Sequence, residues 1–466
     1  MLSEIFKLQR PMKIPHQATP GLAAVGVKSR NNTVALRRET MKSKLLPLFA
    51  ILTLTATAPA QQQPKSALPS APARASALEP ARAARIDQLL QRYVDENRIA
   101  GAVALVLRDG KPVYERAVGW ADKEAGRRMS PSTIFRIASQ TKALTSAAVL
   151  ALVEEGKIEL NERISHFIPT FEKTTVAVKN DSGMNIVPAR RPITIRDLLT
   201  HTAGISYGTE AQVASLYQSK GLGPSAGNGW YTADKDEPIC ETMQRLGSLP
   251  FVAQPGEAFV YGYNTDILGC VVEKASGMSL DEFVRTRITV PLGLKDTRFY
   301  IPAGERDRLA AVYSSDSNGK FVRAPEGSKG QGSYVEGPRK SFAGGAGLTS
   351  TAHDYTRFLE MIRNGGALDG VRILAPRTVA LMTTNQSGTL HSTTGLGFGY
   401  GFQTVDRYGA SGMAGVGAFG WGGAYGTTYQ VDVQSRSVLA LMIQLMPNAT
   451  DIQQKFYTLV YQALLD

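Results

Sequence analysis

The chain has 466 residues, of which 52 are Lys or Arg and 40 are Asp or Glu, giving a formal net charge of +12. Nine of the basic and two of the acidic residues lie within residues 1–60, so the remainder carries only +5 without a dense basic run. This distribution argues against a nucleic-acid partner or a charged membrane surface. The five histidines show neither His-x-His nor His-Glu-x-x-His spacing, which argues against a zinc enzyme. No metal or organic cofactor is expected.

The N-terminal 78 residues are expected to lie outside the folded part of the chain. Residues 41–60 have the features of a secretory signal peptide: basic residues from Lys42, a short apolar stretch, and Ala58-Pro59-Ala60 as a cleavage site. The apolar stretch is shorter than the ~20 residues that a membrane span needs. Residues 1–40 form a leader of uncertain status, because either Met1 or Met41 can be the true start. Residues 61–78 form a flexible tether, and we expect a periplasmic or secreted protein without a membrane span in its mature chain.

After the tether, helical periodicity predicts a helix over residues 81–97. An Asp109-Gly110 turn between two apolar stretches then predicts a β-hairpin of residues 102–107 and 113–119. A long Ala-rich helix follows, and its start carries Ser139-Gln140-Thr141-Lys142. Further helices are expected at 194–199, 267–273, 280–287, 353–364, 376–383 and 452–465. Strands are expected at 427–433 and 438–445, and tight strands and turns in the Gly-rich stretch 395–426.

Strands at both chain ends and helices in the middle indicate an α+β fold. We expect one antiparallel sheet flanked by helices, with a mainly helical domain inserted into it. The sheet domain would comprise residues 79–138 and 291–466, and the helical domain residues 139–290. Cys240 and Cys270 are the only cysteines, and Cys270 lies in an apolar helical stretch. Free thiols in the core are therefore favoured over a disulfide.

The Ser139-x-x-Lys142 spacing carries the first chemical signal. Residues three apart share one helix face, so both side chains lie in one turn beside the positive end of the helix dipole. A serine hydroxyl needs a base to become a nucleophile, and a lysine in a partly dry pocket can lose its charge and act as that base. Ser139 is therefore the candidate nucleophile, against the alternative of a helix cap followed by a solvated lysine.

A second serine motif competes with the first. Gly204-Ile205-Ser206-Tyr207-Gly208 fits the Gly-x-Ser-x-Gly elbow of α/β-hydrolases, which requires a strand before the serine and a helix after it. A helix and the stretch Leu-Thr-His-Thr-Ala-Gly precede Ser206 instead. Ser206 is thus disfavoured as a nucleophile, and His201 is interpreted as structural.

Three segments in order resemble serine hydrolases of the class C β-lactamase and D-Ala-D-Ala carboxypeptidase type, with the closest likeness to family VIII carboxylesterases. These segments are Ser139–Lys142, Tyr261-Gly262-Tyr263-Asn264 with the helix that follows, and Gly420-Trp421-Gly422-Gly423-Ala424. The resemblance runs from about residue 80 to the end. It implies a β-lactamase-like fold and an acyl-enzyme on the serine.

The resemblance also implies roles for individual residues. Tyr261 would share the Ser139 proton with Lys142 and return it to the leaving alcohol, with Tyr263 as the alternative. The backbone N–H groups of Ser139 and Ala424 would form the oxyanion hole. The substrate-binding residues would be Trp421, Gly422, Gly423, Tyr263 and Asn264. The family's Tyr-x-Asn is displaced here, since Asn264 stands one position later, and this puts an Asn contact to a β-lactam amide in doubt.

Trp421 bears on the choice of substrate. Many relatives have Lys or His at this position, whose charge can meet a substrate carboxylate, whereas tryptophan offers an apolar wall. We therefore expect a serine hydrolase that cleaves neutral carboxylic esters. The alternatives are a β-lactamase or D-amino-acid peptidase, an acyltransferase, and a non-catalytic binder of penicillin or peptidoglycan. The expected partner is a small-molecule ester or β-lactam.

Overall fold

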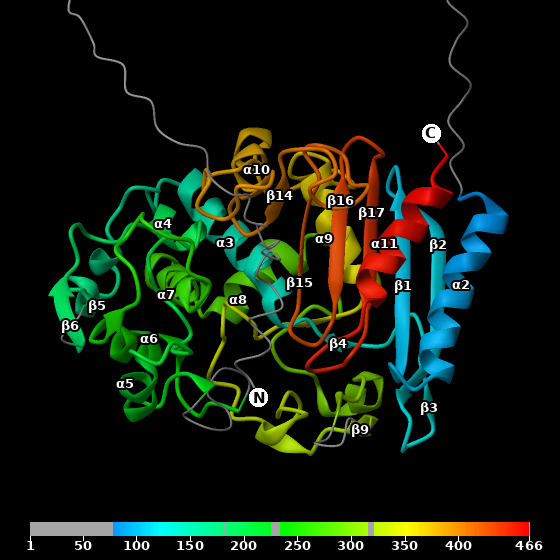
Figure 1. The fold of residues 1–466 in the computed structure, drawn as a ribbon, viewed down its shortest axis with the longest axis horizontal. Coiled ribbons are helices and arrows are strands. Elements are labelled where there is room, and N and C mark those ends of the chain that lie inside the picture. The colour runs from blue at the N-terminus through cyan, green and yellow to red at the C-terminus, as the bar shows by residue number, and fades with distance from the viewer. Residues whose placement is uncertain (1–77, 181–182, 225–233, 316–320, 466) are drawn as a thin grey trace, which may run out of the picture. The chain divides into compact units, whose positions relative to one another are not determined.

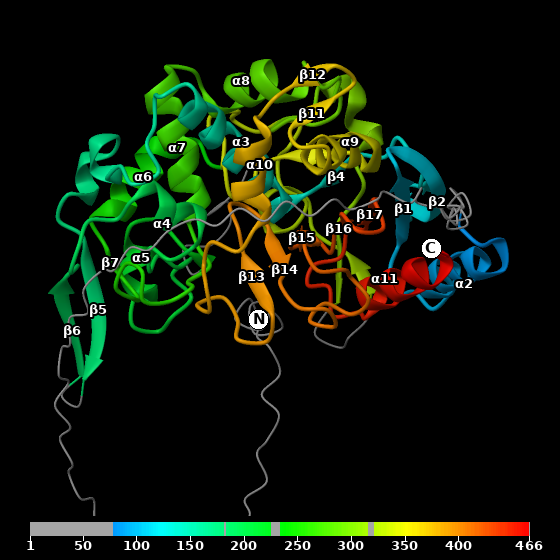
Figure 2. The ribbon, with the colours of Figure 1, turned by 90° about the horizontal axis from the view of Figure 1, so that it is seen from above.

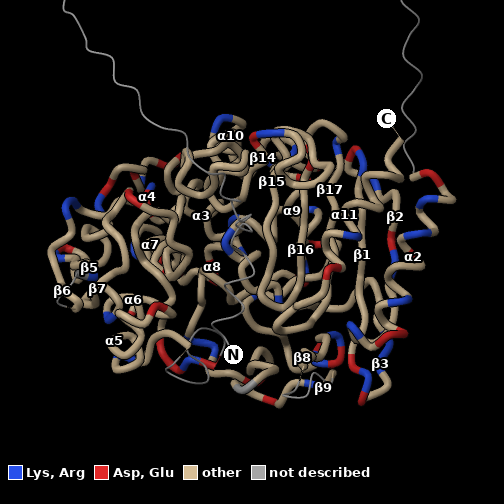
Figure 3. The backbone as a smooth tube through the Cα atoms, in the orientation of Figure 1, with Lys and Arg blue, Asp and Glu red and all other residues tan. Residues whose placement is uncertain are grey.

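The computed structural model describes residues 78–180, 183–224, 234–315 and 321–465. The predicted leader, signal peptide and all but the last residue of the tether lie outside the described residues and stay predictions. Leu78, the last residue of the predicted tether, is buried in the apolar core. No helix among the described residues is long and apolar enough to cross a membrane. Figure 3 shows basic and acidic residues interspersed along the described chain.

An antiparallel sheet of eight strands joins the two ends of the chain, in the order β13-β14-β15-β16-β17-β1-β2-β3. Its strands are β1 (Gly101–Arg108), β2 (Lys111–Asp122), β3 (Arg127–Arg128), β13 (Leu396–Phe398), β14 (Gln403–Val405), β15 (Phe419–Gly422), β16 (Thr428–Asp432) and β17 (Ser437–Met442). The predicted hairpin is confirmed as β1 and β2, and the Gly-rich stretch supplies β13, β14 and β15. β1 pairs with β17, so the sheet is built from both chain ends as expected.

Both faces of the sheet are covered, because every residue of β1 is buried. Alternate side chains of β1 enter two different cores, with Val103 and Leu105 on one face and Ala104 and Val106 on the other. The terminal helices α2 (Pro80–Asp95) and α11 (Ile452–Ala463) cover the second face, while α9 (Ala352–Arg363) covers the first, as Figure 2 shows.

The inserted region lies beside the sheet and is mainly helical (Figure 1). Its helices are α3 (Thr141–Glu154), α4 (Ile195–Leu199), α5 (Ala214–Ser219), α6 (Ile239–Gly247), α7 (Asn264–Ser276) and α8 (Leu280–Val284), with short turns η2 (Ala138–Gln140), η3 (Ile164–His166), η4 (Pro169–Phe171) and η6 (Arg285–Thr289). It also contains a small sheet that the sequence did not predict, made of β5 (Thr175–Asn180), β6 (Gly183–Pro188) and β7 (Pro250–Phe251). One continuous apolar core runs from the large sheet through α3 into α7, and the predicted domain boundaries stay predictions.

Shorter elements complete the chain between α8 and β13. They are η7 (Ala303–Arg308), η8 (Gly327–Lys329), α10 (Pro376–Thr383), β8 (Tyr313–Ser315), β9 (Phe321–Arg323), β10 (Thr349–Ser350), β11 (Ala367–Leu368) and β12 (Val371–Arg372). β10 pairs with β4 (Phe135–Arg136), which leads directly into the predicted nucleophile segment.

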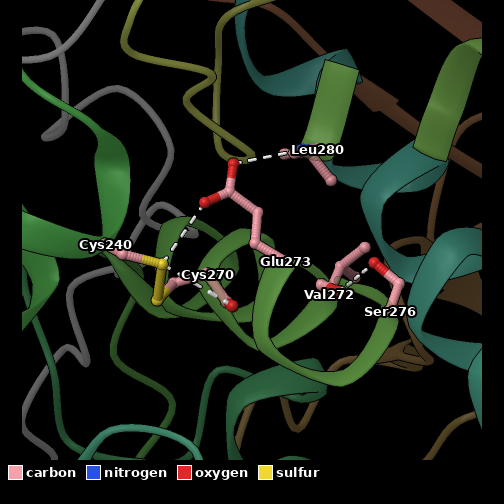
Figure 4. The surroundings of a disulfide bond; sticks show 6 residues. All are labelled: Cys240, Cys270, Val272, Glu273, Ser276 and Leu280. Atoms are coloured by element: carbon pink, nitrogen blue, oxygen red, sulfur yellow. Dashed lines mark hydrogen bonds between the residues drawn. A yellow bond between two sulfur atoms is a disulfide. The ribbon is translucent and has the colours of Figure 1, made fainter. Parts of the chain in front are cut away.

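The prediction of two free thiols is wrong. Cys240 of α6 and Cys270 of α7 form a disulfide whose Cα atoms lie 4.9 Å apart. Cys270 is fully buried in its helix as expected, but no local pattern indicates that α6 packs on this face of α7. Figure 4 shows the bond beside the Glu273 carboxylate, which also accepts a hydrogen bond from the Leu280 N–H at 3.0 Å.

Candidate active site

Ser139 lies in the turn η2, immediately before α3. The preceding residue, Ala138, is buried and has a φ of +42°, a left-handed conformation that costs a non-glycine residue on the order of 1 kcal/mol. Such conformations persist where the surroundings enforce them, and they are frequent at functional sites. Here the kink turns the chain from β4 into the helix and leaves Ser139 half-buried at the junction.

Lys142 is the second residue of α3, and its side chain is only 1% exposed. Its Nζ donates to Ser139 Oγ at 3.3 Å, to the Tyr207 hydroxyl at 3.1 Å and to the Gly345 carbonyl at 2.7 Å. An ammonium group has three N–H donors, so these three acceptors satisfy it completely. The structure therefore brings the two residues of the Ser-x-x-Lys motif together in a dry environment.

Tyr207 was missed by the sequence analysis. It lies in the loop after α4, within the Gly-x-Ser-x-Gly stretch that was weighed only for its serine. Its ring is buried and meets the rings of Tyr261 and Tyr263 edge-on, at centroid distances of 5.9 and 5.0 Å. No spacing or periodicity marks this tyrosine, because its approach to Lys142 depends on how the loop packs against α3.

Tyr261 lies beside Lys142, with its ring centre 4.7 Å from Nζ. Its hydroxyl accepts a hydrogen bond from Trp421 Nε1 at 3.1 Å, and the two rings are 5.5 Å apart. The structure thus places Ser139, Lys142 and Tyr261 around one centre, with Trp421 of β15 at its edge. Both Tyr261 and Trp421 are half-buried, so each presents part of its ring to solvent.

Behind Tyr261, His201 supports the ring from the protein interior, at a centroid distance of 4.8 Å. Burial, and then the positive charge of Lys142, lowers the pKa of His201 well below its usual range. Its Nδ1 accepts a hydrogen bond from the Asn264 amide at 2.9 Å, which also donates to the carbonyls of Ile205 and Val260. His201 is therefore a neutral packing residue in this structure.

Two predicted substrate-binding residues lie in the interior. Asn264 is fully buried and uses its amide on His201 and backbone carbonyls, and the buried Tyr263 hydroxyl accepts from the Gly223 N–H at 2.8 Å. These positions favour a structural role over contact with substrate. Ser206 is also fully buried, in a loop rather than between a strand and a helix, and its Oγ accepts from the Gly208 N–H at 3.0 Å.

The third motif approaches Ser139 through the end of β15, which packs against η2. Gly422 ends the strand, and a Cβ on Gly423 would lie 2.4 Å from the Ile137 carbonyl oxygen, so only glycine allows this approach. The Gly423 N–H donates to Thr427, whereas the N–H of the exposed Ala424 donates to no group among the described residues. This leaves the Ala424 N–H available beside the nucleophile segment.

Trp421 is part of an aromatic cluster. Trp421 meets Phe398 at 5.3 Å, Phe398 meets Phe259 at 5.2 Å, and Phe259 meets His391 at 4.5 Å between ring centroids. Burial lowers the pKa of His391 to about 4, so this histidine is neutral at neutral pH. The rings that meet Trp421 are therefore apolar or uncharged at neutral pH. Among all the described residues, no three His, Cys, Asp or Glu side chains come close enough to bind a metal ion.

The model of the family described as "Beta-lactamase" matches residues 86–463. The chain belongs to this family. The family resemblance drawn from the motifs is confirmed, as is the α+β fold with its antiparallel sheet and inserted helices.

Known relatives of this β-lactamase-family chain include an esterase. It is similar to Esterase EstB from Burkholderia gladioli, with 34% identity over 78% of this chain and 90% of the relative. It is also similar to Protein Rv1367c from Mycobacterium tuberculosis, with 35% identity over 77% of this chain and 89% of the relative.

Solved structures agree with this placement. The structure titled "EstCE1, a hydrolase with promiscuous acyltransferase activity" superposes with a TM-score of 0.67 and 27% identity, over 83% of this chain and 98% of the other. Simvastatin synthase LovD from Aspergillus terreus shares the fold, with a TM-score of 0.66 and 22% identity. The match covers 82% of this chain and 97% of the LovD chain. Together with the esterase relative, these comparisons identify the protein as a serine hydrolase of the β-lactamase family.

Proposed function

We propose that the protein is an exported carboxylesterase that acts through an acyl-enzyme on Ser139. The observation that carries this proposal is the set of three hydrogen bonds on Lys142. When Lys142 is neutral, the Gly345 carbonyl and the Tyr207 hydroxyl can accept its two N–H groups. The remaining lone pair then points to Ser139 Oγ, ready to take the serine proton.

In the first half of the reaction, Ser139 Oγ attacks the ester carbonyl while its proton passes to Lys142. The carbonyl oxygen gains negative charge, which the backbone N–H groups of Ser139 and Ala424 would stabilise. Tyr261 would pass its proton to the departing alcohol and regain one from Lys142, and the Trp421 N–H orients its hydroxyl for that role. In the second half, water attacks the acyl-enzyme while the same groups transfer protons in the opposite direction, and the acid leaves.

The substrate class follows from the groups next to Trp421. A penicillin or a peptide C-terminus carries a carboxylate, which needs a cation close to the reacting carbonyl. The neighbours of Trp421 are aromatic, and His391 is uncharged at neutral pH. A neutral ester with an apolar group on this side suits the site, and the similarity to Esterase EstB supports this substrate class.

Export is part of the proposal and has its own support. The disulfide between Cys240 and Cys270 belongs in an oxidising compartment such as the periplasm or the extracellular medium. The signal peptide expected at residues 41–60 leads to the same compartment. N-terminal sequencing of protein recovered from the periplasm or medium tests this, and retention of the full chain in the cytoplasm would contradict it.

The test of the reaction compares p-nitrophenyl butyrate with nitrocefin. We expect fast ester cleavage, little nitrocefin turnover, and loss of ester cleavage in Ser139→Ala. Ser206→Ala is the matched serine control and should retain activity. Dominant nitrocefin turnover would favour the β-lactamase alternative, covalent labelling without turnover would favour a non-catalytic binder, and activity that survives Ser139→Ala but not Ser206→Ala would overturn the nucleophile assignment.

Acyl transfer to an alcohol is a second candidate. An acyl-enzyme does not dictate its acceptor, and the similar structure EstCE1 is described as a hydrolase with promiscuous acyltransferase activity. Adding a primary alcohol to the ester assay and measuring the new ester against the free acid tests this candidate. Acid as the sole product at every alcohol concentration would exclude it.

A further inference from the structure

Asp266 is a buried carboxylate that the proposed mechanism does not use. It lies in the first turn of α7, five residues after Tyr261, and has no exposed surface. Its Oδ1 accepts a hydrogen bond from the Gly345 N–H at 3.0 Å, whereas its Oδ2 is buried without a hydrogen-bond partner in the described residues. It makes no direct ion pair there. A buried charge without direct compensation is costly, so its presence calls for a functional reason.

The Gly344-Gly345 segment connects Asp266 to Lys142. Gly345 offers its N–H to Asp266 and its carbonyl to Lys142 Nζ at 2.7 Å. One residue earlier, the Gly344 carbonyl accepts from Thr145 Oγ1 at 2.8 Å, one helical turn beyond Lys142. The segment runs between α3 and α7, where a Cβ on Gly344 would lie 2.6 Å from the Thr265 carbonyl oxygen. Both helices therefore hold the backbone that orients Lys142.

Asp266 and Lys142 also interact through their charges. Burial raises the pKa of Asp266 to about 6, and the positive charge of Lys142 opposes that rise. Within the described residues, Lys142 is the cation that favours the charged form of this carboxylate. The other titratable groups facing the pair are Tyr263 beside Asp266, and Tyr207, Tyr261 and His201 around Lys142.

We propose that Asp266 is a positioning residue for Lys142, acting through the Gly345 backbone and through its negative charge. The inference rests on the proposed function. When Ser139 Oγ bonds to the ester carbon, its proton moves to Lys142 and the carbonyl electron pair moves to the oxygen. Lys142 then becomes an ammonium ion inside the protein, and the Asp266 carboxylate stabilises it without taking up a proton. In the Ser-His-Asp triad, an aspartate likewise stabilises the protonated histidine base without taking up the proton.

The first test is Asp266→Asn, which keeps a side-chain oxygen for the Gly345 N–H and removes the charge. We expect kcat for p-nitrophenyl butyrate to fall about 10- to 100-fold while KM changes less than about twofold, since the lost interaction belongs to the transition state. The acidic limb of the kcat/KM profile should move to lower pH by about one unit, because a proton on Lys142 is then less favoured.

Asp197→Asn is the matched control. Asp197 is also a buried carboxylate, but it pairs with Arg191 at 2.6 Å and has no link to Lys142. This variant should lose stability while keeping the wild-type pH profile. The inference is overturned if Asp266→Asn shows the wild-type kcat and profile, or a loss of activity with no shift of the acidic limb.

A second test does not depend on activity. The unfolding midpoints of Asp266→Asn, Lys142→Met and the double variant, measured in urea at pH 8, form a double-mutant cycle. Removing the Asp266 charge should stabilise the Lys142→Met protein more than it stabilises the wild type, because no cation then compensates the carboxylate. Additive midpoint shifts would overturn the inference.

The two tests separate this inference from the proposed function. A non-additive cycle in a protein without ester hydrolysis would reject the proposed substrate class and keep the coupling of Asp266 to Lys142. Ester hydrolysis with an additive cycle would support the proposed function and reject the coupling of Asp266 to Lys142. If Asp266→Asn does not fold, Lys142→Met alone tests the coupling, because proton uptake by Asp266 should then occur at higher pH than in the wild type. An unchanged pH dependence of unfolding would count against it.

Discussion

The Lys142 ammonium and the Tyr207 hydroxyl lie 3.1 Å apart, although 65 residues separate them in the sequence. This contact adds a second tyrosine to the site, next to Tyr261. Since Tyr261 is engaged by Trp421, Tyr207 is the tyrosine whose hydroxyl directly fixes the direction of the Lys142 amine.

Tyr207→Phe should therefore lower activity. A hydrogen bond to a charged group contributes about 1.5–3 kcal/mol, so we expect kcat/KM for p-nitrophenyl butyrate to fall roughly 10- to 100-fold. Tyr263→Phe is the control, because the Tyr263 hydroxyl accepts a hydrogen bond from the Gly223 N–H in the protein interior. That variant should lose about 1 kcal/mol of stability and keep its activity. Equal activities of the two variants would contradict the role of Tyr207.

Trp421→Phe keeps an aromatic wall and removes the N–H that binds the Tyr261 hydroxyl. We expect a drop in kcat of about 5-fold with little change in KM, because the donor orients Tyr261 and a neutral hydrogen bond contributes about 1 kcal/mol. Trp421→Lys is the companion variant. It places a cation beside the site and should raise the ratio of nitrocefin to ester turnover, and an unchanged ratio would show that Trp421 does not set substrate charge.

Acidification should destabilise the protein through its buried histidines. His391 has a folded pKa of about 4, below the ~6.5 of an unfolded histidine, so the unfolded chain binds its proton first as the pH falls. Stability is therefore lost from about pH 6.5 down to pH 4, by on the order of 3 kcal/mol for this residue. His201 acts in the same direction. His391→Gln should flatten the decline in the free energy of unfolding, measured in urea between pH 7 and pH 4.

Asp266 should oppose this acid effect. Its folded pKa of about 6 lies above the ~3.9 of an unfolded aspartate, so the native state binds this proton first and gains stability between pH 6 and pH 4. Asp266→Asn removes that gain. The same urea measurements should show a steeper acid decline in Asp266→Asn than in the wild type, and a parallel decline would show that Asp266 titrates normally.

The disulfide should contribute to stability by restricting the unfolded chain. Cys240 and Cys270 are 30 residues apart, and closing a loop of this size contributes on the order of 3–4 kcal/mol in the chain-entropy account. The double variant Cys240→Ser/Cys270→Ser should lose about that amount in urea denaturation. Reduction of the wild type should reproduce the loss, and a reductant-insensitive midpoint would contradict it.

The sequence predicted those features that local patterns encode. The β1–β2 hairpin, helices α7, α9, α10 and α11, and the approach of Lys142 to Ser139 all follow from turn residues, periodicity or three-residue spacing. The family resemblance predicted substrate-binding roles for Tyr263 and Asn264, and both residues are buried. Their burial depends on the packing of the loop around His201, which no local pattern reveals.

The remaining features depend on contacts between distant segments. Tyr207 and Gly345 contact Lys142, and Asp266 contacts Gly345, because the loop after α4, the Gly-rich segment and α7 converge on α3. The Cys240–Cys270 bond likewise depends on how α6 packs on α7. Each of these residues has an ordinary local sequence, so only the tertiary arrangement identifies its role.

The pairing of β1 with β17 has a consequence for how the protein is made. β1 ends at Arg108, and its neighbour β17 begins only at Ser437. The central strand β1 therefore lacks one of its two partner strands until almost the whole chain has been synthesised. Contacts between such distant segments form slowly. This topology suits the proposed export, because a chain that folds only near the end of synthesis remains acceptable to a translocation channel for unfolded polypeptides.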